Sequence, residues 1–159
     1  MRITLITVGK IKEKYFTDAI AEYQKRLSRY CKLEILEVAD EKTPDGASAA
    51  IEEQIKEKEA ERVRKVLKDS AYTIALAIDG KQMTSENFAE KIQGLGIRGE
   101  SHICFLIGGS LGMSDSLLRQ ADDRISFSKM TFPHQLMRVI LLEQIYRSYR
   151  INCGEPYHK

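Results

Sequence analysis

The last six residues of this 159-residue chain, Gly154 to Lys159, bring together three side chains that can do chemistry. Chain termini are normally frayed, but here a glycine and a proline, which favour turns, precede a phenol, an imidazole and an ammonium. Tyr157 and Lys159 can contact a base and a phosphate, and His158 can move a proton near neutral pH. The tail is therefore a candidate catalytic segment, and the alternative is an ordinary polar terminus.

A second group of candidate residues lies where three predicted strands end, at Leu76–Gly80, Ile107–Gly112 and Phe127–Phe132. In open α/β sheets, ligands bind beyond the carboxyl ends of the strands, because loops and helix N-termini meet there. Glycines after an apolar strand let the backbone approach a flat heterocycle closely, although tight turns explain most such glycines. We expect the three strand ends to converge on one ligand.

Other familiar chemical motifs are missing from the sequence. Residues 108–114, GGSLGMS, form neither a dinucleotide fingerprint nor a Walker loop, which counts against NAD and nucleoside triphosphates. The three histidines, His102, His134 and His158, lack the spacing of metal ligands, and we expect no metal. His102 lies in a strand pattern typical of the core. His134 has a structural explanation, in the first turn of a helix, that is at least as good as a functional one.

Strands and helices alternate along the chain and must position these residues. Period-two or continuous apolar runs predict strands at 1–8, 33–38, 72–78, 101–107 and 125–128, and helical spacing predicts helices at 15–30, 49–68, 85–95, 113–121 and 133–149. Two of the strands are apolar throughout, which is typical of a sheet covered on both faces. We therefore expect a single α/β domain, residues 1–159, with a mainly parallel sheet and helices on both faces.

The final helix has an unusual pattern. Thr131 is a candidate N-cap, Pro133 suits the first turn, and the residues that follow carry apolar side chains on more than one stripe. A helix that is apolar on a broad face must be covered on two sides. We expect the sheet on one side and a second subunit on the other.

Composition and charge indicate the cellular location, the state of the cysteines and the kind of partner to expect. No apolar run approaches the roughly 20 residues of a membrane helix, and the N-terminus has no signal-peptide layout, so a cytoplasmic protein is expected. The three cysteines are odd in number and scattered, which favours reduced thiols, with Cys104 in the core. Residues 1–34 hold eight Lys/Arg against four Asp/Glu, and residues 124–159 hold six against two. Brought together, both ends would form a positive face for a polyanion, unless these charges are merely solvated.

Three motifs support a resemblance to a known family: FLIGGSLG at 105–112, SFSKMTFPHQLMRVILLEQIYRSYRI at 126–151 and the terminal GEPYHK. Together with the opening MRITLITVGK, they resemble the bacterial large-subunit (23S) ribosomal RNA pseudouridine methyltransferases of the SPOUT class, along essentially the whole chain. The resemblance implies methylation of the N3 atom of a pseudouridine by S-adenosylmethionine, on assembled ribosomes. It also implies a homodimer whose C-terminal chain forms a trefoil knot around the methyl donor.

The resemblance also assigns roles to residues of this sequence. It implies a donor site made of Leu76, Gly108, Phe127, Ser128, Lys129, Met130, Thr131 and Phe132. We add the hypothesis that His158, or a water that it orients, helps remove the imide proton of the base, while Tyr157 and Arg150 position the base and its developing oxyanion. We further predict that the tail of one subunit completes the donor site of the other.

Two other interpretations remain open. A small doubly wound protein that binds a nucleotide or a flavin would need a phosphate loop, which the sequence lacks. A non-catalytic, dimeric, ribosome-associated RNA-binding factor would explain the basic ends, but not the glycine-lined strand ends or the tail. Binding of S-adenosylmethionine distinguishes the methyltransferase from both.

Overall fold

The computed structural model describes all residues, 1–159, and contains one five-stranded sheet with five helices. The strands are β1 (Arg2–Val8), β2 (Lys32–Val38), β3 (Tyr72–Lys81), β4 (His102–Ile107) and β5 (Asp123–Ile125). The helices are α1 (Lys14–Leu27), α2 (Ala49–Val66), α3 (Ser85–Ile97), α4 (Asp115–Gln120) and α5 (His134–Asn152). All neighbouring strands are parallel, in the order β2-β1-β4-β3-β5, which confirms the predicted α/β class.

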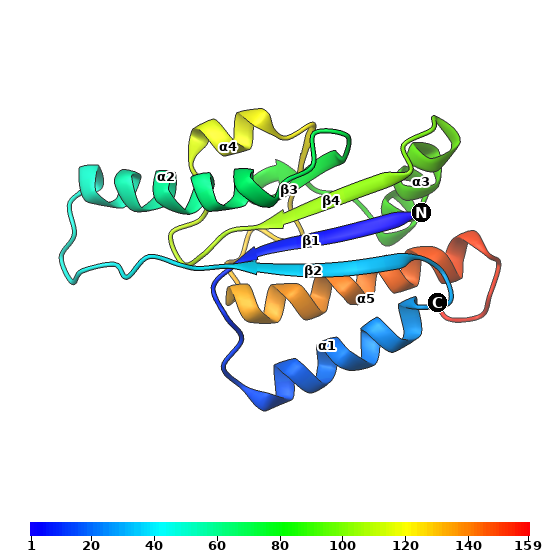
Figure 1. Ribbon diagram of the computed structural model, residues 1–159. Coiled ribbons are helices and arrows are strands. Elements are labelled where there is room, and N and C mark those ends of the chain that lie inside the picture. The colour runs from blue at the N-terminus through cyan, green and yellow to red at the C-terminus, as the bar shows by residue number, and fades with distance from the viewer.

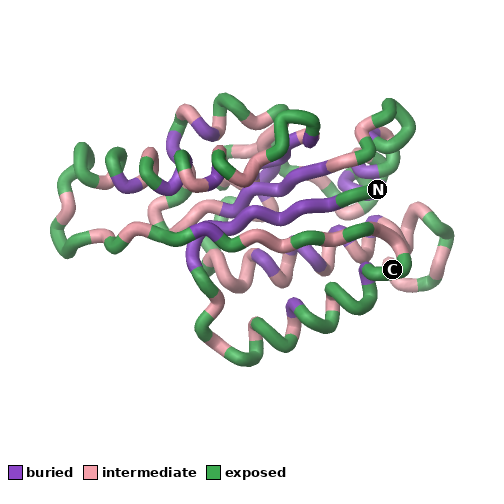
Figure 2. The backbone as a smooth tube through the Cα atoms, viewed as in Figure 1, coloured by how far each residue is buried: buried purple, intermediate pink, exposed green.

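Helices cover both faces of the sheet (Figure 1). Helices α2 and α4 lie on one face, while α1, α3 and α5 lie on the other. The strands in the middle of the sheet are buried, and the outer surfaces of α1 and α2 are exposed (Figure 2). In β1, Ile3 and Leu5 enter the core beneath α5, whereas Ile6 and Val8 enter the core beneath α2, because successive side chains of a strand point to opposite faces. Cys104 lies in the second core, as predicted.

Helix α5 crosses the middle of its face and is flanked by α1 and α3. Its fully buried apolar residues, Leu141, Leu142 and Ile145, face the sheet. Tyr146 and Tyr149 pack toward α1, where their rings meet those of Tyr23 and Tyr30. Much of the apolar surface of α5 is therefore covered by other elements of the same chain. The expectation that a second subunit covers the side away from the sheet stays a prediction.

Helix α5 is fastened to the sheet by a buried arginine. The Arg138 side chain is 1% exposed, and its guanidinium donates to the Glu37 carboxylate (Nη1 to Oε2, 2.6 Å) and to the carbonyl of Gly9 (2.8 Å). Glu37 lies near the end of β2, and Gly9 follows β1 directly. Burial lowers the pKa of Arg138, and Glu37 opposes that shift. The contact brings the first turns of α5 to the carboxyl edge of the sheet.

Three local predictions were wrong, and each error lies near this edge. The strand predicted at 125–128 ends at Ile125, because the Ser126 hydroxyl donates to the Ser128 carbonyl (2.9 Å) and forms a local turn. Thr131 is not the N-cap of the last helix. Pro133 occupies that position, since the residue before a proline disfavours helical geometry and the helix cannot start earlier.

The third error concerns β3, which was predicted to be buried through Ile78. Both Leu76 and Lys81 pair with Ile125, so the chain between them leaves the sheet and Ile78 is 55% exposed. A Cβ at Gly80 would lie 2.6 Å from the Ile125 carbonyl carbon, so only glycine fits where β3 returns to the sheet after the bulge. Helix α3 also continues through Gly94 and Gly96 to Ile97, beyond the predicted end.

The fastening role of Arg138 predicts a large loss of stability in Arg138→Ala. Removing the guanidinium leaves buried carbonyls and the Glu37 carboxylate without their donor, and we expect a loss of about 2–4 kcal/mol in the free energy of unfolding. Urea denaturation measures this value. Asp18→Ala, which removes the exposed Lys14–Asp18 pair, is the control and should change stability by less than about 0.5 kcal/mol. Equal effects of the two substitutions would contradict the role of Arg138.

Candidate functional site

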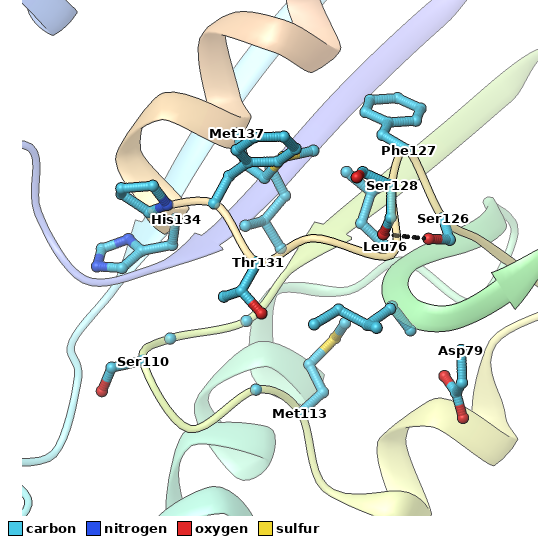
Figure 3. Close-up of a pocket in the computed structure, with 18 of the residues that line it drawn as sticks. Leu76, Asp79, Ser110, Met113, Ser126, Phe127, Ser128, Thr131, His134 and Met137 are labelled. Carbon is cyan, nitrogen blue, oxygen red and sulfur yellow. Dashed lines mark hydrogen bonds between the residues drawn. The ribbon is translucent and has the colours of Figure 1, made fainter. Parts of the chain in front are cut away.

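A cavity of about 820 Å³ opens at the carboxyl edge of the sheet (Figure 3). Its walls come from the bulge at the end of β3, the glycine turn after β4, the extended chain after β5 and the first residues of α5. The first three of these are the strand ends singled out in the sequence, and the structure brings them together as expected. The volume lies within the range of about 300–1,000 Å³ that is usual for small-molecule pockets.

All the residues of the predicted donor site except Lys129 line this cavity. Lys129 is exposed and absent from the lining. The walls are largely apolar: Leu76 and Phe127 lie on one side, and Phe127 is held edge-on against Phe88 with ring centroids 6.0 Å apart. Such walls suit a flat, uncharged ring. Binding of a methyl donor to these residues stays a prediction.

The glycine turn after β4 has no room for side chains. A Cβ on Gly108 would lie 2.9 Å from both the Gly112 carbonyl carbon and the Met113 Cγ. Gly112 has φ +83°, and its amide donates to the Gly109 carbonyl (3.0 Å), which closes the turn. Glycine at these positions therefore lets the main chain itself form the floor of the cavity.

Several lining residues were not predicted as site residues, although some lie within the singled-out strand ends. Asp79, Ser110 and Met113 come from the loops, and His134 and Met137 come from the start of α5. The sequence left His134 open between a structural and a functional role. Burial and the positive charge of Arg138 lower the pKa of His134, so its imidazole is neutral over a wider pH range. Its Nδ1 atom is buried without a hydrogen-bond partner.

The predicted catalytic residues lie elsewhere, around the C-terminal end of α5. The Tyr157 hydroxyl donates to Glu143 (3.0 Å), and the Arg147 guanidinium lies over the Tyr157 ring at 4.7 Å from its centroid. Burial, together with the hydrogen bond to Glu143, raises the pKa of Tyr157 to about 12. The tail therefore folds back on the outer side of α5, where sequence reasoning had not picked out Glu143 and Arg147.

His158 and Arg150 have distinct partners in this region. Arginine only donates, so the contact of Arg147 with the His158 Nδ1 (3.2 Å) makes that nitrogen an acceptor, and Nε2 then donates to Glu86 (2.7 Å). Arg150 contacts the Glu155 carboxylate and the Tyr30 hydroxyl. Arg150 thus anchors the tail of its own chain to the turn between α1 and β2.

The cavity and the tail contact different parts of one helix. His134 lines the cavity, whereas Tyr157 contacts Glu143, about 14 Å further along α5 at 1.5 Å per residue, and no residue of the tail lines the cavity. A methyl group cannot be passed over that distance. Within one chain, the residues predicted to bind the donor and those predicted to act on the base do not form one site.

Two further observations concern ligands and surroundings. No three His, Cys, Asp or Glu side chains are grouped so that they could hold a metal ion. None of the five helices combines the length and the apolar character that a membrane span needs.

The two basic ends of the chain do meet, since α1 packs beside α5 and the Lys12 amide donates to the Gln135 side chain (3.2 Å).

Comparison with known proteins places these features in a family. Residues 1–158 match the family described as "Predicted SPOUT methyltransferase". Proteins named ribosomal RNA large subunit methyltransferase H match over the full length of both chains, with 69% identity in Bifidobacterium adolescentis and 62% in Clostridium beijerinckii.

Two solved structures share the fold at low sequence identity. A probable methyltransferase from Bordetella pertussis matches 92% of this chain and 95% of its own with a TM-score of 0.57 and 10% identity. A probable methylase family protein from Haemophilus influenzae matches 99% of this chain and 70% of its own, with a TM-score of 0.56 and 9% identity. At such identities the likeness concerns the fold alone.

The glycine turn generates a prediction for Gly108→Ala. The added Cβ must displace the backbone at Gly112, so the turn moves into the cavity, and we expect binding of S-adenosylmethionine to weaken at least about tenfold. Isothermal calorimetry measures the affinity.

Gly94→Ala, within α3, is the matched control. A Cβ there meets nothing within 4 Å, so donor binding should stay unchanged and the fold should be as stable or slightly more stable. Undiminished binding by a folded Gly108→Ala protein would show that the turn does not contact the donor.

Proposed function

Because the chain belongs to the SPOUT methyltransferase family, we propose that it transfers a methyl group from S-adenosylmethionine to the N3 atom of a pseudouridine in large-subunit (23S) ribosomal RNA. The observation that carries the proposal is the cavity at the three strand ends, which is of suitable size and has a main-chain floor. The RNA target rests on the names of the full-length relatives. The N3 position rests on the resemblance of the motifs.

The residues of the cavity fit the donor. Leu76 and Phe127 offer apolar walls to an adenine ring, and the turn at Gly108 admits a ligand close to its amides and carbonyls. Asp79 carries a negative charge at the other side of the cavity, opposite in sign to a sulfonium. Lys129, which the resemblance places in the donor site, lies outside the cavity.

The chemistry requires alignment and removal of one proton. The bound donor supplies an activated methyl group: the N3 lone pair forms the new N–C bond, and the electrons of the broken S–C bond stay on sulfur. The protein must hold the base at near-attack distance and accept the imide proton. We propose that His158 receives it, directly or through water, once its Nδ1 is released from Arg147, since Nε2 already donates to Glu86. Tyr157 and Arg150 are proposed to position the base and its oxyanion.

A homodimer resolves the separation between cavity and tail. Leu136 and Ile140 lie on the side of α5 away from the sheet, outside both buried cores, and the neighbouring Met130 and Phe132 are 74% and 36% exposed. Further along the same side of the helix, the tail packs on Glu143 and Arg147. An antiparallel twofold contact would place the tail of one subunit over the apolar patch, and therefore over the cavity, of the other.

The substrate is proposed to be RNA within the assembled ribosome. We propose that recognition uses the shape of a folded surface together with the basic side of this α/β domain. The decisive experiment incubates the protein with ribosomes that lack the modification and with labelled S-adenosylmethionine, and then maps the methylated nucleotide. A label on N3 of a pseudouridine supports the proposal. Donor binding with a label elsewhere, or with none, would contradict it.

The shared site predicts complementation in mixed dimers of Gly108→Ala and His158→Ala subunits. Each homodimer lacks one half of every site, whereas a mixed dimer keeps one site with an intact cavity and an intact tail. Random mixing should restore roughly a quarter of wild-type activity under the twofold arrangement. The measurement is methyl transfer after the two purified variants are unfolded and refolded together.

Two controls define this result. Each variant refolded alone must remain inactive, and mixing either variant with itself must change nothing. If each chain used its own tail, every site of the mixed dimer would carry one defect, and activity would stay at the level of the separate variants.

A further inference from the structure

Between the end of β1 and the first turn of α1, three lysines and a tyrosine are exposed. Lys10, Lys12 and Lys14 alternate with other residues, and all three are exposed. Tyr15 follows and is 66% exposed, the highest exposure of any aromatic side chain in the molecule. Its ring is supported by the half-buried Phe16, with centroids 4.5 Å apart. An exposed, supported ring next to several cations has the features of a surface that binds single-stranded nucleic acid.

This segment, residues 10–15, borders the cavity. The Lys12 amide donates to Gln135 Oε1 (3.2 Å), and a Cβ on the preceding Gly9 would lie 3.4 Å from His134 Cε1. His134 is itself part of the cavity wall. The segment leaves the same edge of the sheet at which α5 begins (Figure 1). Any macromolecule whose base enters the cavity mouth therefore passes close to the lysines.

The charges of the segment are available to a ligand. Lys10 and Lys12 form no ion pair, and Lys14 pairs only with the exposed Asp18. The nearby Glu37 carboxylate is occupied by Arg138 and by the Ile11 amide. An exposed pair such as Lys14–Asp18 contributes little and is readily exchanged for a phosphate contact. Lys10 and Lys12 are therefore unpaired cations near the start of α5, with the carboxylates of Glu13 and Asp40 as acidic neighbours, whereas Asp79 lies on the other side of the cavity from His134.

We propose that residues 10–15 form an RNA clamp: Lys10, Lys12 and Lys14 neutralise backbone phosphates, and a base next to the target stacks on Tyr15. The proposal rests on the proposed function and names the part of the surface that holds the substrate. Phosphate contacts by lysine give affinity that depends on salt, whereas stacking contributes regardless of base identity. The clamp thus holds single-stranded RNA at the mouth of the cavity without reading much of its sequence.

The test compares two lysine triple variants with equal charge changes. Lys10→Ala/Lys12→Ala/Lys14→Ala removes the clamp cations, and Lys58→Ala/Lys65→Ala/Lys68→Ala removes three exposed lysines on or just after α2, across the sheet. Binding of a single-stranded oligouridylate and of large ribosomal subunits is measured by filter retention at several salt concentrations. Methyl transfer to the same subunits gives KM and kcat, and calorimetry gives donor affinity.

The clamp predicts a specific set of results. The first triple variant should bind RNA at least about tenfold more weakly, and its salt slope should fall by roughly 0.7 for each phosphate that the protein no longer neutralises. KM should rise by a similar factor, with kcat and donor affinity within about twofold of wild type. Tyr15→Ala should weaken binding about 5- to 100-fold, and Tyr15→Phe should restore it, because stacking needs the ring and not the hydroxyl.

The outcomes separate the clamp from the proposed function. Equal RNA affinity of the two triple variants, or equal effects of Tyr15→Ala and Tyr15→Phe, overturns the clamp. If wild-type protein binds RNA through these residues but methylates no ribosome, the clamp stands and the proposed reaction fails. If ribosomes are methylated with unchanged KM by the first triple variant, the reaction stands and the clamp fails.

Discussion

The buried guanidinium of Arg138 is the contact on which the arrangement of the carboxyl edge depends. It binds the end of β1 through a carbonyl and the end of β2 through Glu37, and it belongs to the second turn of α5. His134 and Met137, which precede it in the first turn, are thereby held as a wall of the cavity. The same contact fixes the start of the segment that leads to α1, because Gly9 supplies the carbonyl. The cavity and the basic segment are thus held by the contacts of one buried guanidinium.

The length of α5 divides the chemistry between two places. Its first turn lines the cavity, and its last turns carry the tail that holds Tyr157 and His158. No residue of the tail lines the cavity of its own chain. In the proposed dimer, each chain would contribute the cavity to one site and the tail to the other, which would bring a proton acceptor to the proposed methyl donor. The exposed apolar patch at the start of α5 marks where the twofold contact is expected.

Much of the fold was predictable because its signals are local. Alternation in residues 2–8 and the continuous apolar run at 102–107 identified β1 and β4, and the helical spacing from residue 85 correctly predicted the start of α3. The strand ends that form the cavity followed from the parallel order of the strands. What could not be predicted depends on distant neighbours. The bulge before Gly80 is set by Ile125, and the burial of Arg138 is set by Glu37 and by two carbonyls far away in sequence.

The site was predicted in part for the same reason. The residues proposed to bind the donor follow their strands, whereas Lys129 is exposed outside the cavity, after the turn at Ser126–Ser128. Glu143 and Arg147 resembled an ordinary pair at helical spacing until the tail was seen to fold onto them. The trefoil knot and the dimer, both implied by the resemblance, stay predictions.

A crystal structure of the protein with S-adenosylhomocysteine tests the central claim most directly. The account predicts the ligand in the cavity between Leu76, Gly108 and Phe127, with the tail of a second subunit facing its sulfur across a twofold axis through α5. A ligand met by the tail of its own chain, or a monomer with the sulfur open to solvent, would contradict it.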